Sequence, residues 1–246
     1  IALLPHVLTM DYDVIISGGG LTGIILALAL DQTGISTAII DKNTPLVATN
    51  NIFDGRSYAI AAASQKMLNM LGLWKNLAKN AQPMLEIKVS DGYGGEVPSP
   101  FVMQFDRQDF TEGPMGYMIE DRHLRQVLQG ALKYSKVKFQ SNTQVLSQTV
   151  QPTHVAAKLN SGATITAAVL VGADGRTSNT AKTAGLTRSG WDYGQSSLVC
   201  VIAHEKPHNG IAHQYFMPSG PLAILPLTGN RSGIVWTEKT ETAHLI

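Results

Sequence analysis

The sequence is poor in cysteine, in net charge and in long apolar runs. One cysteine among 246 residues excludes an intramolecular disulfide and favours a reducing compartment, so we expect a cytoplasmic protein. This residue, Cys200, lies in the run SLVCVIA, which predicts a buried packing role. The 19 Lys and Arg nearly balance the 18 Asp and Glu, and no basic stripe is present, so nucleic acid is not an expected partner. The apolar segment GIILALAL is far too short to span a bilayer, which leaves peripheral membrane contact open.

Patterns typical of metal sites and of hydrolases are also missing. The seven histidines occur singly, and Pro207 denies His204 and His208 a shared helix face, so we expect no metal. No G-x-S-x-G nucleophile elbow is present. No side chain stands out as a catalytic nucleophile or base, so the catalytic residues stay unknown. This pattern is expected where a bound cofactor carries the chemistry.

Apolar sequence sufficient for a core is present. Hydrophobic residues make up 44% of the chain and charged residues 15%, which describes a globular protein with one large or two modest domains. The first ten residues carry no basic leader and no cleavage site, so we expect residues 1–10 to be a tail before a start at Met10.

A dinucleotide-binding pattern follows directly. The run DYDVIISGG reads as a buried strand, and the next residues fit G-x-G-x-x-G with Gly18, Gly20 and Gly23. A helix and a second strand, STAIIDK, lead to Asp41, which is 41 − 23 = 18 residues past the last glycine. An acidic residue at about this spacing holds a ribose hydroxyl, and the helix N-terminus attracts phosphate. The pattern predicts a βαβ site for FAD or NAD rather than NADP.

The rest of the chain alternates between helical patterns and segments of short strands. Residues 57–77 are expected to form a helix, and Gly and Pro punctuate short strands over 83–118. A helical pattern returns in EDRHLRQVLQGALKYS, and a hairpin is expected around residues 160–162. We therefore predict an α/β fold with a discontinuous FAD-binding Rossmann-like domain and an interleaved, largely antiparallel substrate-domain sheet. The predicted ranges are 11–82 and 109–190 for the first and 83–108 and 191–246 for the second.

The stretch VLVGADGRTSN, residues 169–179, is a second place where an apolar strand is followed by glycine and an acidic residue. Asp174 followed by Gly175 suits a tight hairpin, but the residues after them are small, polar and then helix-like. A second strand-to-helix crossing beside the first is the better interpretation. Arg56 and Arg122 each precede or open a helix, and each is either a solvated arginine or a guanidinium that reaches an anion such as a cofactor phosphate.

Several motifs together resemble the ubiquinone-biosynthesis hydroxylases, FAD-dependent aromatic monooxygenases built like para-hydroxybenzoate hydroxylase. The resemblance runs from about residue 11 to 236. It rests on these runs: GGGLTG, DGRSYAIAAASQKMLNMLGLW, GYMIEDRHLRQVL, VLVGADGRTSNTAK, WDYGQSSLVCVI and GPLAILPL.

The resemblance implies a set of cofactor-binding residues. Asp41 and the glycine motif would hold the ADP half of FAD, and the backbone of Val145 would meet the adenine. Arg56 would line the cofactor and reductant side, and Arg122 would lie near the flavin. Asp174 and Gly175 would serve both FAD and NAD(P)H. The cofactor-binding set is Gly18, Gly20, Leu21, Thr22, Gly23, Asp41, Lys42, Arg56, Arg122, Val145, Asp174 and Gly175. Leu222, Leu225 and Pro226, in the run GPLAILPL, are hypothetical substrate contacts.

The implied activity is hydroxylation of the ring of a polyprenylated phenol in ubiquinone biosynthesis, with NAD(P)H, O₂ and a flavin C4a-hydroperoxide. Other ubiquinone-biosynthesis proteins and the inner-membrane surface are further candidate partners. The family carries a later Gly-Asp motif that this sequence lacks, so we expect that a C-terminal part is missing. Two alternatives stay open: a non-catalytic FAD- or quinone-binding subunit, and a flavin-dependent prenyl reductase.

Overall fold

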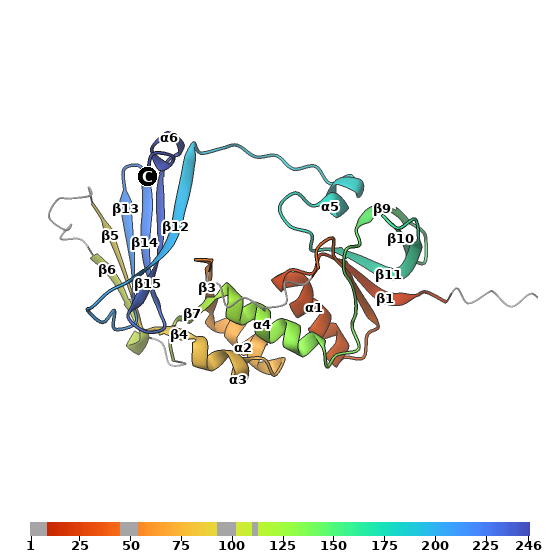
Figure 1. Cartoon of the computed structure of the whole chain (residues 1–246), viewed down its shortest axis with the longest axis horizontal. Coiled ribbons are helices and arrows are strands. Elements are labelled where there is room, and N and C mark those ends of the chain that lie inside the picture. The colour runs from red at the N-terminus through yellow and green to blue at the C-terminus, as the bar shows by residue number, and fades with distance from the viewer. Residues whose placement is uncertain (1–8, 45–53, 93–101, 110–112) are drawn as a thin grey trace, which may run out of the picture. The chain divides into compact units, whose positions relative to one another are not determined.

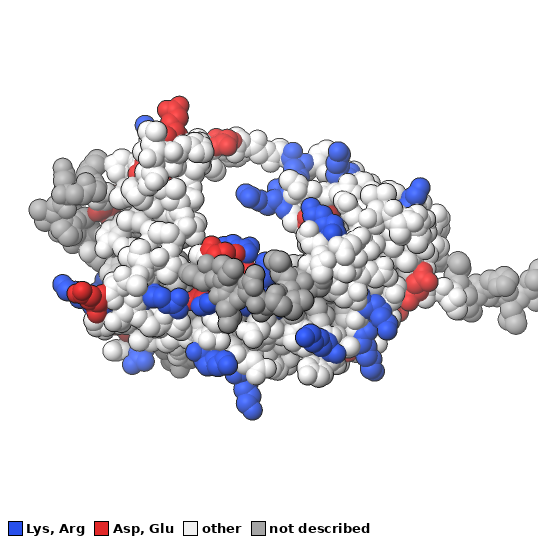
Figure 2. All heavy atoms as spheres, in the orientation of Figure 1, with Lys and Arg blue, Asp and Glu red and all other residues white. Residues whose placement is uncertain are grey.

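The computed structural model describes residues 9–44, 54–92, 102–109 and 113–246. The chain forms two compact units (Figure 1). Unit 1 comprises residues 1–49 and 128–189, and unit 2 comprises residues 50–127 and 190–246. On the face shown in Figure 2, the basic and acidic side chains of the described residues are scattered and form no broad patch of one sign.

Unit 1 is built on one six-stranded sheet in the order β8-β2-β1-β11-β10-β9. β8, β2, β1 and β11 run parallel, whereas β10 and β9 continue the sheet antiparallel. The strands are β1 (Tyr12–Ser17), β2 (Thr37–Ile40), β8 (Lys138–Gln140), β9 (Val145–Val150), β10 (Val155–Leu159) and β11 (Thr164–Gly172). The helices are α1 (Leu21–Gln32), α5 (Asn179–Thr183) and the C-terminal part of α4 (Asp121–Leu132).

Buried apolar side chains from distant strands form the core of unit 1. Ile15 of β1 and Ile40 of β2 pack in one cluster with Val145 of β9 and with side chains of β10 and β11. Ile15 is fully buried, as is its neighbour Ile16. The run of apolar residues in β1 is therefore explained by burial on both faces, as is usual for a parallel strand.

Unit 2 contains a six-stranded and a three-stranded sheet. The larger sheet has the order β12-β15-β14-β13-β5-β6, and its strands pair antiparallel except for β13 with β5. Its strands are β5 (Glu86–Asp91), β6 (Val102–Asp106), β12 (Gln195–Ala203), β13 (Ile211–Met217), β14 (Gly220–Leu227) and β15 (Arg231–Lys239). The smaller sheet is β3 (Ser57–Ala61), β7 (Gly116–Glu120) and β4 (Gln82–Met84) in the order β3-β7-β4. The remaining elements are α2 (Ala62–Met70), α3 (Trp74–Leu77), α6 (Thr240–Ala243), the start of α4, and the 3₁₀ helices η1 (Ala78–Asn80) and η2 (Arg107–Asp109).

The predicted fold class is confirmed, and two local predictions are wrong. Residues 57–61 form β3 and not the first turns of a helix, because they pair antiparallel with β7 over the full length of both strands. Cys200 is exposed and not buried, because β12 lies at the edge of its sheet, with β15 as its one partner among the described strands. Tertiary pairing overrides local propensity in the first case.

The two units divide the chain differently from the predicted domains. Residues 54–82 and 113–127 pack in unit 2, since the small sheet joins β3, β4 and β7 there. The assignment of an FAD-binding and a substrate-binding role to separate domains stays a prediction. The predicted tail falls mostly outside the described residues, which begin at residue 9.

Candidate functional site

The carboxyl ends of three neighbouring parallel strands lie side by side in the unit 1 sheet. β1 lies between β2 and β11, so Gly18, Asp41 and Ala173 all follow directly from neighbouring strands. In open α/β sheets, the carboxyl ends of the strands are where ligands bind. Asp174 stands between parallel strand β11 and helix α5, so the second glycine turn is a strand-to-helix crossing and not a hairpin.

Steric requirements explain two of the motif glycines. Gly18 has φ = +111°, and a Cβ there would lie 2.5 Å from the carbonyl carbon of Ala173. A Cβ on Gly23 would overlap the carbonyl oxygen of Gly18. These glycines let the end of β11 and the first turn of α1 approach the β1 turn closely. A Cβ on Gly20, in contrast, would meet no atom of the described residues within 4 Å, so among these residues the backbone is open to a ligand there.

The N-terminus of α1 is suited to an anion. Gly20 is the N-cap residue in an extended conformation, no side chain in the described part of the chain caps the helix, and its first turn carries no acidic residue. The first N–H groups of a helix lack intrahelical acceptors, and the helix dipole adds partial positive charge at this end. A diphosphate approaching over Gly20 would therefore meet oriented donors.

Asp41 lies across from the glycine turn at the end of β2. Its carboxylate accepts the N–H of Gly19 at 2.5 Å and the N–H of Asn43 at 2.7 Å. Phe139 of β8 supports the same turn, because a Cβ on Gly19 would lie 2.6 Å from its ring. Backbone contacts on both sides thus fix the carboxylate and the turn relative to each other.

Asp174 is engaged by the start of α5. One carboxylate oxygen accepts the hydroxyl of Ser178, and the other accepts the N–H and the hydroxyl of Thr180, each at 3.0 Å. Burial raises the pKa of Asp174, but these hydrogen bonds outweigh it and leave the pKa below its ordinary value. The carboxylate holds the loop that contains Gly175, whose φ of +88° favours glycine. Direct contact of Asp174 with a cofactor stays a prediction.

These elements enclose a cleft of about 270 Å³ within unit 1. Ligand sites that enclose a whole small molecule measure about 300–1,000 Å³, so this cleft fits part of a dinucleotide and not all of it. It is lined by Ser17, Gly18, Gly20, Ile40, Asp41, Lys42, Asn43, Thr143, Gln144, Val145, Ala173, Asp174, Gly175, Thr177 and Asn179. Seven of the predicted cofactor-binding residues are among these: Gly18, Gly20, Asp41, Lys42, Val145, Asp174 and Gly175.

Three residues that line the cleft were not predicted from the sequence: Thr143, Gln144 and Asn179. The Asn179 amide donates to the carbonyl oxygens of Val145 and Leu146 at 3.1 and 3.0 Å, which ties the start of α5 to the start of β9. A turn at Asn142, with φ = 54°, brings the next two residues to the cleft. The Ser-Asn-Thr run at this turn was the only local signal.

Arg56 and Arg122 belong to unit 2. The Arg56 guanidinium binds Asp54 at 2.5 Å and buried Asp121 at 3.3 Å, and Arg122 binds buried Glu120 at 2.7 Å. Arg125 also binds Asp121, at 2.6 Å, and Arg231 lies 2.7 Å from Glu120. We call these seven side chains the carboxylate–arginine cluster: Asp54, Arg56, Glu120, Asp121, Arg122, Arg125 and Arg231. A cofactor contact of either predicted arginine stays a prediction.

The three hypothetical substrate contacts also lie in unit 2, on β14. Leu225 packs against a core of buried residues that includes Met118 and Leu227. Pro226 is buried, and Leu222 is half-buried. Their contact with substrate stays a prediction.

The described part of the chain has neither a metal-binding cluster nor a membrane-spanning helix. Within residues 9–44, 54–92, 102–109 and 113–246, no group of three or more His, Cys, Asp and Glu side chains could hold a metal ion. None of the helices in these ranges has the length and apolar character needed to cross a bilayer.

Comparison with known proteins places these observations in a family. A sequence model described as "FAD binding domain" matches residues 11–242. The chain is 40% identical over 232 residues to ubiquinone hydroxylase UbiL of Rhodospirillum rubrum, with 93% of this chain and 52% of the relative covered. It is 31% identical over 228 residues to 3-demethoxyubiquinol 3-hydroxylase of Escherichia coli, with 91% and 56% covered. The chain thus spans about half the length of these curated relatives.

The fold recurs in a solved structure. Pseudomonas aeruginosa PqsL, in complex with 2-aminobenzoylacetate, superposes with a TM-score of 0.79 at 20% sequence identity. The superposition covers 95% of this chain and 62% of PqsL. At this identity the likeness shows the fold alone.

Proposed function

The chain belongs to the FAD-binding domain family, and we propose that it is the FAD-binding part of an aromatic-ring monooxygenase of ubiquinone biosynthesis. The names of its relatives, ubiquinone hydroxylase UbiL and 3-demethoxyubiquinol 3-hydroxylase, support this reaction class. The resemblance that the sequence motifs suggested is thereby confirmed at the level of the family.

The cleft at the end of β1 is the observation that carries the proposal. Its residues fit the ADP half of FAD: the uncapped N-terminus of α1 would face the diphosphate, and open backbone at Gly20 would allow it to approach. Asp41 would accept a ribose hydroxyl, as acidic residues at the end of the second strand do in this type of site. The cleft volume of about 270 Å³ agrees with a partial enclosure of the cofactor.

When bound, FAD would supply the redox chemistry that couples NAD(P)H and O₂ to oxygenation of a phenol ring. The chain itself would bind and orient. The glycine turn and α1 would fix the diphosphate, and Asp174, through Ser178 and Thr180, would hold the neighbouring loop in place. Arg56, Arg122 and Lys42 are proposed as further cofactor contacts.

A polyprenylated phenol is the proposed substrate, and β14 with Leu222, Leu225 and Pro226 is a proposed wall of its site. We propose a cytoplasmic protein. An apolar substrate of this kind partitions into membranes, which supports peripheral contact of the protein with the inner membrane. Other enzymes of ubiquinone biosynthesis are proposed as further partners.

The test is a cofactor assay on the purified chain and a product assay on the full-length protein that contains it. We expect the chain to bind FAD and to show a flavin absorbance spectrum. With NAD(P)H, O₂ and a polyprenylated phenol, we expect the full-length protein to consume NAD(P)H and to form a hydroxylated product detected by mass spectrometry. A full-length protein that binds FAD but forms no product would favour the non-catalytic subunit. A colourless chain with no FAD affinity would contradict the proposal altogether.

A further inference from the structure

Strand β9 has one neighbour among the described strands of the unit 1 sheet. It stands last in the order β8-β2-β1-β11-β10-β9 and pairs with β10. Its first residue, Val145, is 2% exposed and lines the cleft together with Thr143 and Gln144. We call residues 143–145 the β9 wall of the cleft. The end of an edge strand opens locally more easily than a central strand, so contacts beyond the sheet decide how firmly this wall is held.

Hydrogen bonds hold the first two residues of the β9 wall. The N–H of Thr143 donates to the carbonyl of Asp41 at 2.9 Å, so the wall directly borders the end of β2. The N–H of Gln144 donates to the side-chain oxygen of Asn160 at 3.1 Å, and the N–H of Asn160 donates to the carbonyl of Gln144 at 3.0 Å. These bonds tie the wall to β2 and to the turn that follows β10.

Asn179 of α5 holds the third residue of the β9 wall. Its amide donates to the carbonyls of the first two residues of β9 at 3.1 and 3.0 Å. The residues on either side of it, Ser178 and Thr180, bind the two oxygens of the Asp174 carboxylate. Three consecutive residues therefore join the β9 wall to the loop that carries Asp174.

The β9 wall lies where the nucleoside of a dinucleotide would extend. This placement rests on the proposed function, in which α1 faces the diphosphate and Asp41 accepts a ribose hydroxyl. Because Thr143 is bonded to the backbone of Asp41, the base attached to that ribose would lie within reach of the wall. A wall that is fixed before binding lowers the entropy that binding costs.

We propose that Asn179 is a positioning residue for FAD, which keeps the β9 wall and the Asp174 loop at the separation that the nucleoside needs. Asn179 lines the cleft and acts through the backbone carbonyls of β9. A side chain that holds a binding segment in place raises affinity even where another group makes the contact with the ligand.

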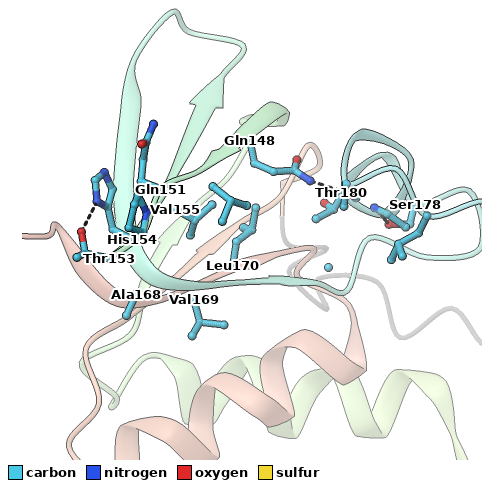
Figure 3. A pocket seen from close by; sticks show the side chains of 16 residues that line it. Gln148, Gln151, Thr153, His154, Val155, Ala168, Val169, Leu170, Ser178 and Thr180 are labelled. Atoms are coloured by element: carbon cyan, nitrogen blue, oxygen red, sulfur yellow. Dashed lines mark hydrogen bonds between the residues drawn. The ribbon is translucent and has the colours of Figure 1, made fainter.

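Gln148 makes a second connection between the same two elements. Its amide donates to the carbonyl of Thr180 at 2.9 Å, and its oxygen accepts the hydroxyl of Thr183 at 2.5 Å. Figure 3 shows this side chain extending from β9 toward Thr180. Gln148 and Asn179 are both half-buried amides, but Gln148 does not line the cleft. Gln148 is therefore the matched control, because it joins β9 to α5 without bordering the cleft.

Ligand titration of two nearly isosteric variants tests the proposal. Asn179→Leu and Gln148→Met each keep the approximate size of the side chain and remove its amide. We expect Asn179→Leu to weaken the binding of FAD and of ADP about tenfold, roughly the effect of one net hydrogen bond. Inorganic pyrophosphate, measured as a competitor of FAD, should keep its affinity because it lacks the nucleoside. Gln148→Met should leave the dissociation constants of FAD, ADP and pyrophosphate unchanged.

Amide hydrogen exchange of the ligand-free chain tests the positioning without FAD. We expect the amides of Thr143 and Gln144 to exchange about tenfold faster in Asn179→Leu, because the wall loses its bonds to α5. Gln148→Met should leave these two rates unchanged. Should Asn179→Leu fail to fold, Asn179→Ala removes the same hydrogen bonds and introduces the residue that most favours a helix.

Three results would overturn the proposal. One is an Asn179 variant that binds FAD and ADP as tightly as the unchanged chain. Another is an equal loss of affinity in Gln148→Met, which would give Asn179 a general role in stability. The third is unchanged exchange of Thr143 and Gln144 in the Asn179 variant. If the unchanged chain binds neither FAD nor ADP, the proposed function fails and the positioning role fails with it, whereas the three results above refute the positioning role alone.

Discussion

The two units use charge in opposite ways. In the cleft of unit 1, an uncapped helix N-terminus and a glycine with open space beside it offer donors that a ligand can reach. In unit 2, two carboxylates that are 2% and 3% exposed, Glu120 and Asp121, are surrounded by arginines of the same unit. Unit 1 leaves polar groups available for binding, whereas unit 2 neutralises buried charge internally.

An acidic residue and an arginine can both belong to recognisable motifs and still have different roles in the structure. Asp41 stands at a strand end, where the fold itself creates a cleft. Arg56 and Arg122 belong to equally suggestive motifs, but each compensates a buried carboxylate. Loss of such compensation is costly because a buried charge would be left unpaired.

The largest effect is expected from adding a side chain where α1 packs against the glycine turn. In Gly23→Ala, the new Cβ would overlap the Gly18 carbonyl oxygen, a backbone atom that cannot move alone. We expect a loss of about 3 kcal/mol in the free energy of unfolding and loss of FAD binding. Gly130→Ala in α4 is the control, because its Cβ meets nothing within 4 Å, and it should stabilise by about 1 kcal/mol. Urea denaturation of both variants measures the difference, and equal effects would contradict the close approach.

The second effect tests the charge compensation of unit 2. Glu120→Ala removes the common partner of Arg122 and Arg231, and we expect a loss of about 3 kcal/mol in unfolding free energy. This value is at the low end for a buried pair because both arginines reach solvent. Asp54→Ala removes an exposed partner of Arg56 and should cost less than about 1 kcal/mol. If thermal unfolding shows the two variants to be alike, Glu120 does not anchor the cluster.

The third effect is a change in the affinity of unit 1 for FAD. Asp41→Ala should weaken FAD binding about ten- to hundredfold, because it removes a charged hydrogen-bond acceptor from the cleft. Asp13→Ala is the control, since the Asp13 carboxylate likewise accepts a backbone N–H, that of Ser36, but does not line the cleft. Fluorescence titration should give the Asp13 variant an unchanged dissociation constant. A similar loss in both variants would point to a general effect on the fold.

The smallest effect is a difference between the two units in how their stability depends on pH. Burial lowers the pKa of His123 and of His213, both in unit 2. Each side chain takes up a proton more readily when unfolded, so stability falls as the pH drops below about 6.5. The lowered pKa of Asp174 in unit 1 acts in another range, since its contribution is lost only below about pH 3.9. The melting temperature between pH 8 and 5 should fall by a few degrees, and the double variant His123→Gln, His213→Gln should flatten that slope.

Local patterns made the cleft largely predictable. The strand, glycines, helix and acid from residue 12 to 41 are consecutive, and each has a recognisable type and spacing. The second strand end with Asp174 was also readable, because small polar residues and not a return strand follow it. These are short-range signals, which a sequence displays directly.

What depends on distant pairing was not predictable. The local pattern predicts a helix for residues 57–61, because their partner strand, residues 116–120, lies more than fifty positions away in the sequence. The exposure of Cys200 follows from the position of β12 at a sheet edge, which no local pattern reveals. Glu120 and Asp121 looked like ordinary first-turn acids, and only packing showed that they are buried.

Residue-resolved FAD titration tests the central claim most directly. NMR chemical shifts of the backbone amides are followed as FAD is added to the purified chain. We expect a saturable complex with the largest chemical-shift changes at Gly20, Asp41 and Asn179, around the cleft of unit 1. Saturable binding with changes confined to unit 2, or no binding of FAD at all, would contradict it.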